Sequence, residues 1–213
     1  MTLPNRLVFA IDDDASVRKG VSRLLRSAGY EAEVFDSAAN FLTRPRHTGA
    51  SCVIVDVQMP GLNGIDFQET LLQRRREEQL IFITGHGDIP MCARAMKAGA
   101  VDFLSKPFKP RDLLKCVERA LTRSTEQHAR IDRRNQARHL LDSLTPREFE
   151  VMQLLATGML NKQVGGELGI TEKTVKVHRG RITQKLRITS VAEMVQLLHK
   201  AEVREPAAEK TTV

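Results

Sequence analysis

The chain has 213 residues, 41% of them hydrophobic and 28% charged, which is the composition of a globular protein with room for one large domain or two ordinary ones. No apolar run approaches the ~20 residues of a membrane-spanning helix, and the first apolar stretch ends in three acids, which indicates a strand and not a secretory signal. The three cysteines are odd in number and lack the spacing of a metal or redox site, so we expect reduced thiols in a cytoplasmic protein with no membrane partner.

Short apolar runs alternate with amphipathic stretches from the N-terminus to about residue 121. The apolar runs predict strands over residues 7–11, 31–35, 52–55, 80–83 and 101–104. The amphipathic stretches predict helices over residues 15–28, 37–43, 66–76, 90–98 and 110–121. Five such repeats favour an α/β domain with a doubly wound, parallel five-stranded sheet of the flavodoxin-like class, in which ligands bind beyond the carboxyl ends of the strands.

The stretch 124–142 contains no Gly or Pro and is rich in Arg and Gln. Two interpretations stay open from the residues alone, namely a helix that prolongs the preceding one and a solvated flexible connector. We take 124–143 as a helical linker between a first domain at 1–123 and a second at 144–205. The remaining tail, 206–213, is expected to be disordered.

The second domain has a purely helical pattern with short turns, which predicts an all-α domain of four helices. Thr145 and Glu148 fit a capping box for its first helix, which should stop at Gly158. The other helix starts are expected to be capped by Asn161, Thr171 and Ser190, the last forming a second capping box with Glu193.

Polar side chains of complementary chemistry follow the predicted strands at their carboxyl ends: Asp12, Asp13, Asp56, Thr84 and Lys106. Because parallel strands present these ends at one edge of the sheet, the five side chains should meet there. Three carboxylates at one place repel one another, and a divalent cation such as Mg²⁺ relieves the repulsion. Carboxylates, a hydroxyl, an ammonium group and Mg²⁺ are the parts of a phosphoryl-transfer site, in which Asp56 is the best candidate for a nucleophile that forms an aspartyl phosphate.

Four stretches resemble the receiver domain of two-component response regulators over roughly residues 5–123: IDDD, VDVQMPGLNG, FITGHGDIP and MKAGAVDFLSKPF. The resemblance implies that Asp56 accepts a phosphoryl group from a sensor histidine kinase. It implies that Mg²⁺ or Mn²⁺ is held by Asp12, Asp13, Asp56 and the backbone carbonyl of Gln58. It also implies that Lys106 contacts the phosphoryl group, that Thr84 moves to hydrogen-bond it, and that Phe103 is an aromatic switch drawn inward with the threonine.

Residues 173–187 carry six Lys or Arg and no acid, which favours a polyanion as the partner of this predicted helix over a merely solvated basic face. The helical period sorts the side chains onto two faces. The packing face should hold Val175, His178, Ile182 and Leu186. The opposite face, which fits a major groove, should hold Lys173, Lys176, Val177, Gly180 and Gln184.

The stretch LTPREFEVMQLLATGMLNKQVGGELGITEKTVKVHRGRITQKL is similar to the LuxR-type helix-turn-helix of FixJ/NarL regulators, and the resemblance spans about residues 144–203. It implies that the helix beginning near Glu172 reads double-stranded promoter DNA. Base contacts are expected from Lys176 and Val177, and the rest of the DNA-binding set, chiefly phosphate contacts, comprises Lys173, Thr174, His178, Arg179 and Arg181. Gly165–Gly166 departs from the family pattern and should cost on the order of 1 kcal/mol per glycine in helix stability.

The two halves together predict a phosphorylation-activated transcriptional regulator that forms a homodimer through the surface at 90–121, with RNA polymerase as a further partner. We expect no enzymatic activity beyond self-catalysed phosphorylation and dephosphorylation. One alternative is a Mg²⁺-dependent phosphohydrolase with an Asp nucleophile, which Gln58 argues against because such enzymes usually carry a second acid there. Another is a ligand-gated LuxR-type regulator, which leaves the acidic set unexplained.

Overall fold

The computed structural model of the chain describes residues 6–85 and 89–201. The chain divides into two compact units, Met1–His128 and Ala129–Val213. No helix in the described parts of these units combines the length and the apolar character needed to cross a membrane. The predicted disordered tail at 206–213 lies outside the described residues.

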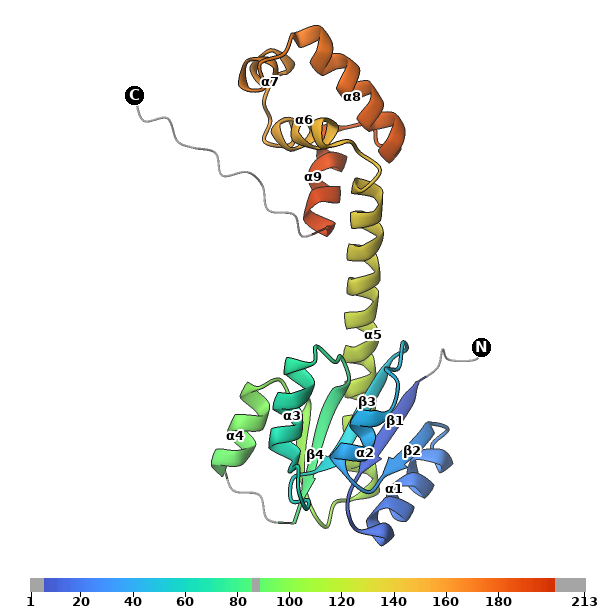
Figure 1. Cartoon of the computed structure of the whole chain (residues 1–213). Helices are drawn as coiled ribbons and strands as arrows, with labels where there is room; N and C mark the ends of the chain where they lie inside the picture. The colour runs from blue at the N-terminus through green and yellow to red at the C-terminus, as the bar shows by residue number, and fades with distance from the viewer. Residues whose placement is uncertain (1–5, 86–88, 202–213) are drawn as a thin grey trace. The chain divides into compact units, whose positions relative to one another are not determined.

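The first unit is built around a parallel five-stranded sheet of order β2-β1-β3-β4-β5 (Figure 1). Its strands are β1 (Leu7–Ile11), β2 (Glu31–Phe35), β3 (Ser51–Asp56), β4 (Gln79–Thr84) and β5 (Asp102–Ser105). Its helices are α1 (Ala15–Ser27), α2 (Ala38–Thr43), α3 (Gly64–Gln73), α4 (Ile89–Lys97) and α5 (Pro110–Leu141). This order of strands and helices confirms the predicted doubly wound α/β fold. Residues 124–141 continue α5 as one helix.

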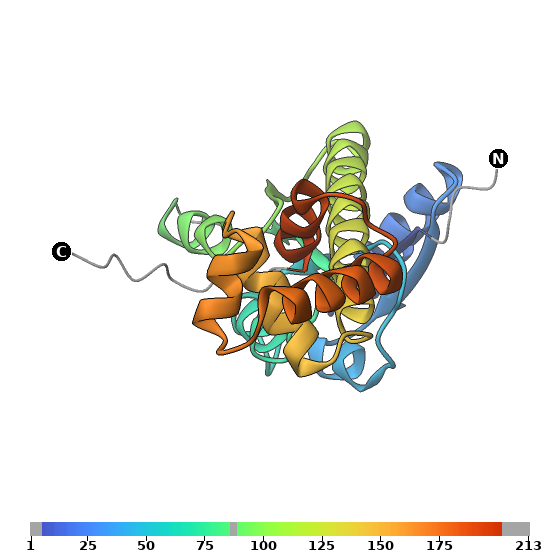
Figure 2. The same cartoon turned by 90° about the horizontal axis from the view of Figure 1, so that it is seen from above.

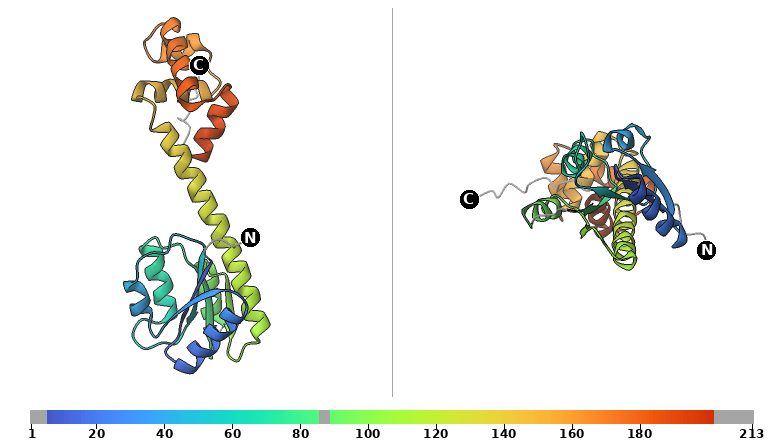
Figure 3. Two further views of the ribbon diagram at one scale, coloured as in Figure 1. Left: turned by 90° about the vertical axis from the view of Figure 1, so that its right-hand side faces the viewer. Right: turned by 90° about the horizontal axis from the view of Figure 1, so that it is seen from below.

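Alternate residues of the central strands pack on opposite faces of the sheet, as expected for a sheet that is covered on both sides. Val8 and Ala10 of β1 join a core with α1 and α5. Phe9 and Ile11 of the same strand join a core with α2, α3 and α4. Figure 3 shows α3 and α5 on opposite sides of the strands. Because both faces of the sheet are buried, the polar residues of the central strands occur at the ends of these strands.

Helix α3 begins two residues before the predicted start at 66. The reason is Asn63, whose Oδ1 accepts hydrogen bonds from the backbone N–H groups of Ile65 and Asp66, both at 2.9 Å. The helix ends at Gln73, and Arg75 then adopts a left-handed backbone with φ of 51°. The predicted boundary was wrong because an Asn N-cap inside a Pro/Gly turn has no periodic signal.

The second unit confirms the predicted all-α class (Figure 2, orange to red). Its helices are the end of α5, then α6 (Pro146–Ala156), α7 (Asn161–Glu167), α8 (Glu172–Leu186) and α9 (Val191–Lys200). Val151, Val164, Val175, Ile182 and Met194 are completely buried and form the centre of its core. Each of the four short helices therefore contributes at least one completely buried apolar residue to a single core.

Helix capping follows the predictions in part. The Thr145–Glu148 capping box is present, and Thr171 caps α8. The predicted cap at Asn161 is wrong, because Asn161 is already helical and Leu160 precedes the helix, its N–H donating to Gln163 Oε1 at 2.8 Å. Ser190 caps α9 as expected. The Glu193 carboxylate, however, accepts from the N–H of Thr189 at 2.6 Å, so the expected reciprocal bond is displaced by one residue.

Candidate functional site

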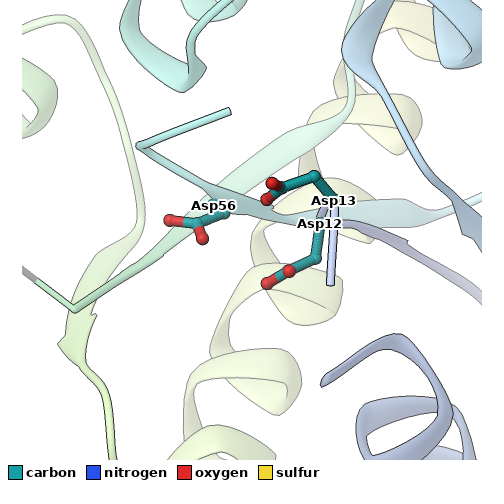
Figure 4. A group of neighbouring side chains, drawn as sticks. All are labelled: Asp12, Asp13 and Asp56. Atoms are coloured by element: carbon teal, nitrogen blue, oxygen red, sulfur yellow. The ribbon is translucent and has the colours of Figure 1, made fainter. Parts of the chain in front are cut away.

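Three carboxyl groups meet at the carboxyl edge of the sheet, as predicted. Asp12 and Asp13 follow β1 directly, and Asp56 is the last residue of β3. One ligand oxygen from each of these side chains lies within 4.8 Å of the others (Figure 4). Asp12 and Asp56 are only 1% and 6% exposed, whereas Asp13 faces solvent. Two of the three charges are therefore held where water solvates them poorly.

Lys106 lies between the two buried acids. Its Nζ donates to Asp12 Oδ2 at 2.7 Å and to Asp56 Oδ2 at 2.6 Å. Burial raises the pKa of Asp12, and the hydrogen bond from Lys106 only partly opposes that rise. Burial acts to lower the pKa of Lys106, but its bonds to the two carboxylates outweigh burial and leave that pKa above its usual value. The ammonium group thus remains charged and partly neutralises the crowded acids.

Backbone hydrogen bonds in the turn after β3 fix the position of Asp56. The N–H of Gln58 donates to Asp56 Oδ1 at 3.1 Å, and the N–H of Gly64 donates to the carbonyl of Val57 at 2.9 Å. A Cβ on Gly64 would lie 2.5 Å from the backbone oxygen of Asp56 and 2.9 Å from the Cα of Val57. Only glycine allows the start of α3 to approach the end of β3 this closely.

We expect Gly64→Ala to destabilise the first unit by about 1–3 kcal/mol, because the added methyl group must push the backbone of Asp56 away. Urea unfolding followed by tyrosine fluorescence measures this unit alone, since Tyr30 is the single tyrosine and the chain has no tryptophan. Gly20→Ala is the control, because a Cβ at that position in α1 meets no atom within 4 Å. It should gain about 0.5–1 kcal/mol, and equal losses in the two variants would contradict the expected clash.

Thr84 and Phe103 lie on β4 and β5, the two strands that follow β3 in the order of the sheet. Thr84 ends β4, is fully buried, and accepts a backbone hydrogen bond from the N–H of Lys106 at 2.7 Å. Phe103 on β5 is half-buried and stacks at a tilt against Phe82, with ring centroids 6.1 Å apart. Both residues lie where the sequence places them. Their expected movement stays a prediction, as does the role of the Gln58 carbonyl as a metal ligand.

Arg18 belongs to the site although the sequence reasoning did not predict it. Its Nη1 donates to the backbone carbonyls of Asp12 and Asp13, at 2.7 and 2.9 Å. Asp14 caps α1, accepting from the N–H of Ser16 at 2.7 Å, and its own N–H donates to Asp12 Oδ1. These bonds fix the loop that carries two of the acids. A basic residue on the first turns of a helix is too common for its pattern to have revealed the contact.

The donor set fits a hard divalent cation. The ligand atoms that Asp12, Asp13 and Asp56 offer are all carboxylate oxygens, which Mg²⁺ and Mn²⁺ prefer. These oxygens lie within 4.8 Å of one another, so a small closure brings them to ligand distances of about 2.1 Å from a shared ion. The presence of the Lys106 ammonium beside them lowers the charge that a cation has to neutralise. An acidic cluster able to bind a metal is therefore present at this edge.

In the second unit, α8 presents two distinct faces. Val175, Ile182 and Leu186 are buried, as predicted for the packing face. The exposed residues of α8 include Lys173, Lys176, Val177, Gly180, Arg181 and Gln184, while Thr174, His178 and Arg179 are half-buried. Lys176 forms an ion pair of 2.9 Å with Glu172 one turn earlier. The predicted groove-facing side is thus free of core contacts.

Lys185 was predicted to be one of six basic residues that face a polyanion, and the structure corrects this prediction. Its Nζ donates to Glu148 Oε2 at 2.6 Å and to the carbonyl of Ser143 at 3.1 Å. The Glu148 side chain is 3% exposed and also accepts from the N–H of Thr145. The hydrogen bond from Lys185 is the main reason that the pKa of Glu148 is lowered. Lys185 therefore joins α8 to the start of α6 and serves the fold.

The two glycines of α7 differ in their surroundings. A Cβ on Gly165 would lie 2.7 Å from the carbonyl oxygen of Ile170, in the turn that leads to α8. A Cβ on Gly166 would meet nothing within 4 Å. Gly165 thus permits the close approach of the turn to α7, whereas the cost in helix stability expected at Gly166 has no such compensation.

Residues 8–118 match the family "Response regulator receiver domain", and residues 142–198 match "Bacterial regulatory proteins, luxR family". The chain is 42% identical to Nodulation protein W of Bradyrhizobium diazoefficiens, over 97% of this chain and 91% of that protein. The chain belongs to the response regulators with a LuxR-type DNA-binding domain. It is also 37% identical to Transcriptional regulatory protein FixJ of Azorhizobium caulinodans, over 96% of both chains.

Solved structures agree with this response-regulator family. The response regulator StyR shares 48% identity with a TM-score of 0.81, over 92% of this chain and 99% of that one. Full-length FixJ from B. japonicum shares 34% identity with a TM-score of 0.55, over 95% and 100%. The protein is therefore a two-component transcriptional regulator. The ligand-gated alternative is not supported, because the N-terminal half matches the receiver family.

Proposed function

We propose that Asp56 is the phosphoryl acceptor of this response regulator and that a sensor histidine kinase is the donor. The observation that carries the proposal is the bridge of Lys106 between Asp56 and Asp12 at the carboxyl edge of the sheet. A buried carboxylate at a strand end, with an ammonium group 2.6 Å away, is placed both to attack phosphorus and to have the incoming charge neutralised.

In the proposed reaction a carboxylate oxygen of Asp56 forms a bond to phosphorus while the P–N bond of a phosphohistidine breaks. The product is an acyl phosphate, and the electron pair of the broken bond stays on the histidine nitrogen. Lys106 would exchange its contact with Asp56 for one with a phosphoryl oxygen, and Thr84 would donate a hydrogen bond to another. Mg²⁺ or Mn²⁺, held by Asp12, Asp13, Asp56 and the carbonyl of Gln58, would neutralise the remaining oxygen charge.

We further propose that phosphorylation promotes a homodimer through the surface at 90–121, which then binds promoter DNA through α8. Met96 of α4 lies within this surface and is 44% exposed. Ile89 of the same helix, one residue before the surface begins, is 85% exposed, and both support an apolar contact there. Lys176 and Val177 would contact bases, and Lys173, Thr174, His178, Arg179 and Arg181 would complete the DNA-binding set. We also propose RNA polymerase as a partner and the cytoplasm as the location of the protein. The proposed chemistry is limited to self-catalysed phosphorylation and dephosphorylation of the chain.

The test is incubation of the full chain with acetyl phosphate and Mg²⁺, followed by intact-mass spectrometry and size-exclusion chromatography. Wild type should gain one phosphoryl group and form a dimer, and Asp56→Asn should do neither. An Asp56→Asn protein that still dimerises and gains DNA affinity would sink the mechanism. Steady turnover of a generic phosphate ester, dependent on Asp56, would instead favour the phosphohydrolase alternative.

A further inference from the structure

Helix α5 stays attached to the first unit beyond residue 118, where the receiver match ends. Ser124 is completely buried, and its Oγ accepts a hydrogen bond of 3.0 Å from the backbone N–H of Ser51. Ser51 is the first residue of β3 and is 2% exposed. The hydroxyl group therefore satisfies a buried backbone donor at the amino end of the central strand.

A second hydrogen bond between α5 and the first residue of a strand follows one turn later, this time between two side chains. Gln79, the first residue of β4, is 8% exposed, and its Nε2 donates to Gln127 Oε1 at 2.8 Å. His128 Nδ1 lies 3.7 Å from a carboxylate oxygen of Glu77. Positions 124, 127 and 128 share one face of the helix. Along this face, the contact of α5 with the sheet changes from apolar side chains to directional hydrogen bonds at the first residues of two strands.

The same two strands carry the candidate site at their other ends. β3 runs from Ser51 to Asp56, and β4 runs from Gln79 to Thr84. They pair in parallel register from Cys52↔Gln79 to Asp56↔Ile83, so the ladder of hydrogen bonds prevents either strand from sliding alone. β3 therefore connects Asp56 at its carboxyl end to the Ser51–Ser124 hydrogen bond at its amino end. β4 connects Thr84 to the Gln79–Gln127 hydrogen bond in the same way.

We propose that Ser124 and Gln127 are positioning residues that couple the state of Asp56 to helix α5. The inference rests on the proposed phosphorylation of Asp56. An apolar contact between a helix and a sheet tolerates small slides, whereas a hydrogen bond weakens steeply with distance and angle. A shift of β3 and β4 at the carboxyl edge is then passed to α5 as a change of its position or rotation. Without these two bonds, the contact between helix and sheet absorbs the shift.

The test compares full-length Ser124→Ala/Gln127→Leu with a matched pair on the exposed side of the same helix, Thr122→Ala/Glu126→Ala. DNA selected by the phosphorylated wild type is titrated with each protein, with and without beryllofluoride, and the ratio of the two dissociation constants is the activation factor. The Ser124/Gln127 variant should lose about fivefold or more of this factor, the size of an ordinary coupling. It should still accept a phosphoryl group from acetyl phosphate, and the control pair should retain the wild-type factor.

An activation factor within about twofold of wild type in the Ser124/Gln127 variant would overturn the inference, because a coupling carries at least about fivefold. So would a variant that no longer takes up phosphate, since the contacts would then serve only the fold of the first unit. Hydrogen exchange on wild type is the second measurement, and amides at 124–128 whose exchange rates do not respond to beryllofluoride would also overturn it. A wild type that is not phosphorylated at all would instead count against the proposed function.

Discussion

Lys185→Met should destabilise the second unit by on the order of 2 kcal/mol, because it leaves the carboxylate of Glu148 buried without its cationic partner. The loss of a charge from the surface of α8 would by itself cost little. The measurement is urea unfolding followed by far-ultraviolet circular dichroism together with Tyr30 fluorescence. The helical signal should show an earlier transition, while the tyrosine signal, which comes from the first unit, stays unchanged.

Arg181→Met is the matched control, since it removes one positive charge from the exposed side of the same helix. It should weaken DNA binding and leave the unfolding transition of the second unit in place. The double variant Lys185→Met/Glu148→Gln should recover part of the stability, because the buried group is then neutral. If Lys185→Met and Arg181→Met were equally stable, the structural role of Lys185 would be wrong.

The ion pair also has a pH dependence whose sign follows from the lowered pKa of Glu148. A carboxyl group with a depressed pKa in the folded state contributes stability that is fully present above its usual pKa of 4.5. That contribution is lost as the pH falls through the depressed value. The second unit of wild type should therefore lose stability in this acid range, and Glu148→Gln should lose less.

Asp12→Asn should raise the free energy of unfolding of the metal-free first unit at neutral pH. The raised pKa of Asp12 means that its ionised form costs stability, and that this cost is present once the pH has risen above the folded-state value. The amide removes the charge and keeps an oxygen that can accept from Lys106. Tyr30 fluorescence during urea unfolding measures the effect in this unit.

Magnesium should reverse the order of these two proteins. Wild type should gain about 2.7 kcal/mol at a Mg²⁺ concentration 100 times its dissociation constant, because the cation binds only the folded cluster. Asp12→Asn should gain much less, since it lacks one of the oxygen charges. Glu126→Ala, which removes one acid from the exposed side of α5, serves as the control for general electrostatic effects. Equal stabilisation of all three proteins by Mg²⁺ would show that the cluster does not bind the ion.

The sequence predicted the acidic site well because the topology of a parallel sheet determines where its residues lie. Asp12, Asp56 and Lys106 each follow an apolar run of strand length, and parallel strands must bring such positions to one edge. The role of Lys185 could not be predicted in the same way. Its partner Glu148 lies 37 residues away, and its charge reads as one more basic residue on a basic helix. Only the packing of α6 against α8 brings its ammonium group to the buried carboxylate of Glu148.

The pairing of short polar side chains with the backbone was the other feature that the sequence did not predict. Asn63, Asn161 and Ser124 belong to residue types that accept from nearby N–H groups. The first begins a helix, the second lies within one, and the third bonds to a strand 73 residues away. Nothing in the residue types separates these outcomes, because they depend on which backbone groups the fold leaves without a partner.

The ion pair between Lys185 and Glu148 also bears on the thermodynamics of DNA binding. A lysine whose charge is already neutralised within the fold neutralises no DNA phosphate on binding, and so releases no condensed counterion from the DNA. The salt dependence of binding, which falls by about 0.9 in logarithmic slope for each phosphate neutralised, is then set by the other basic residues of α8. We therefore expect Lys185, which pairs with the buried Glu148, to add nothing to the salt dependence of DNA binding.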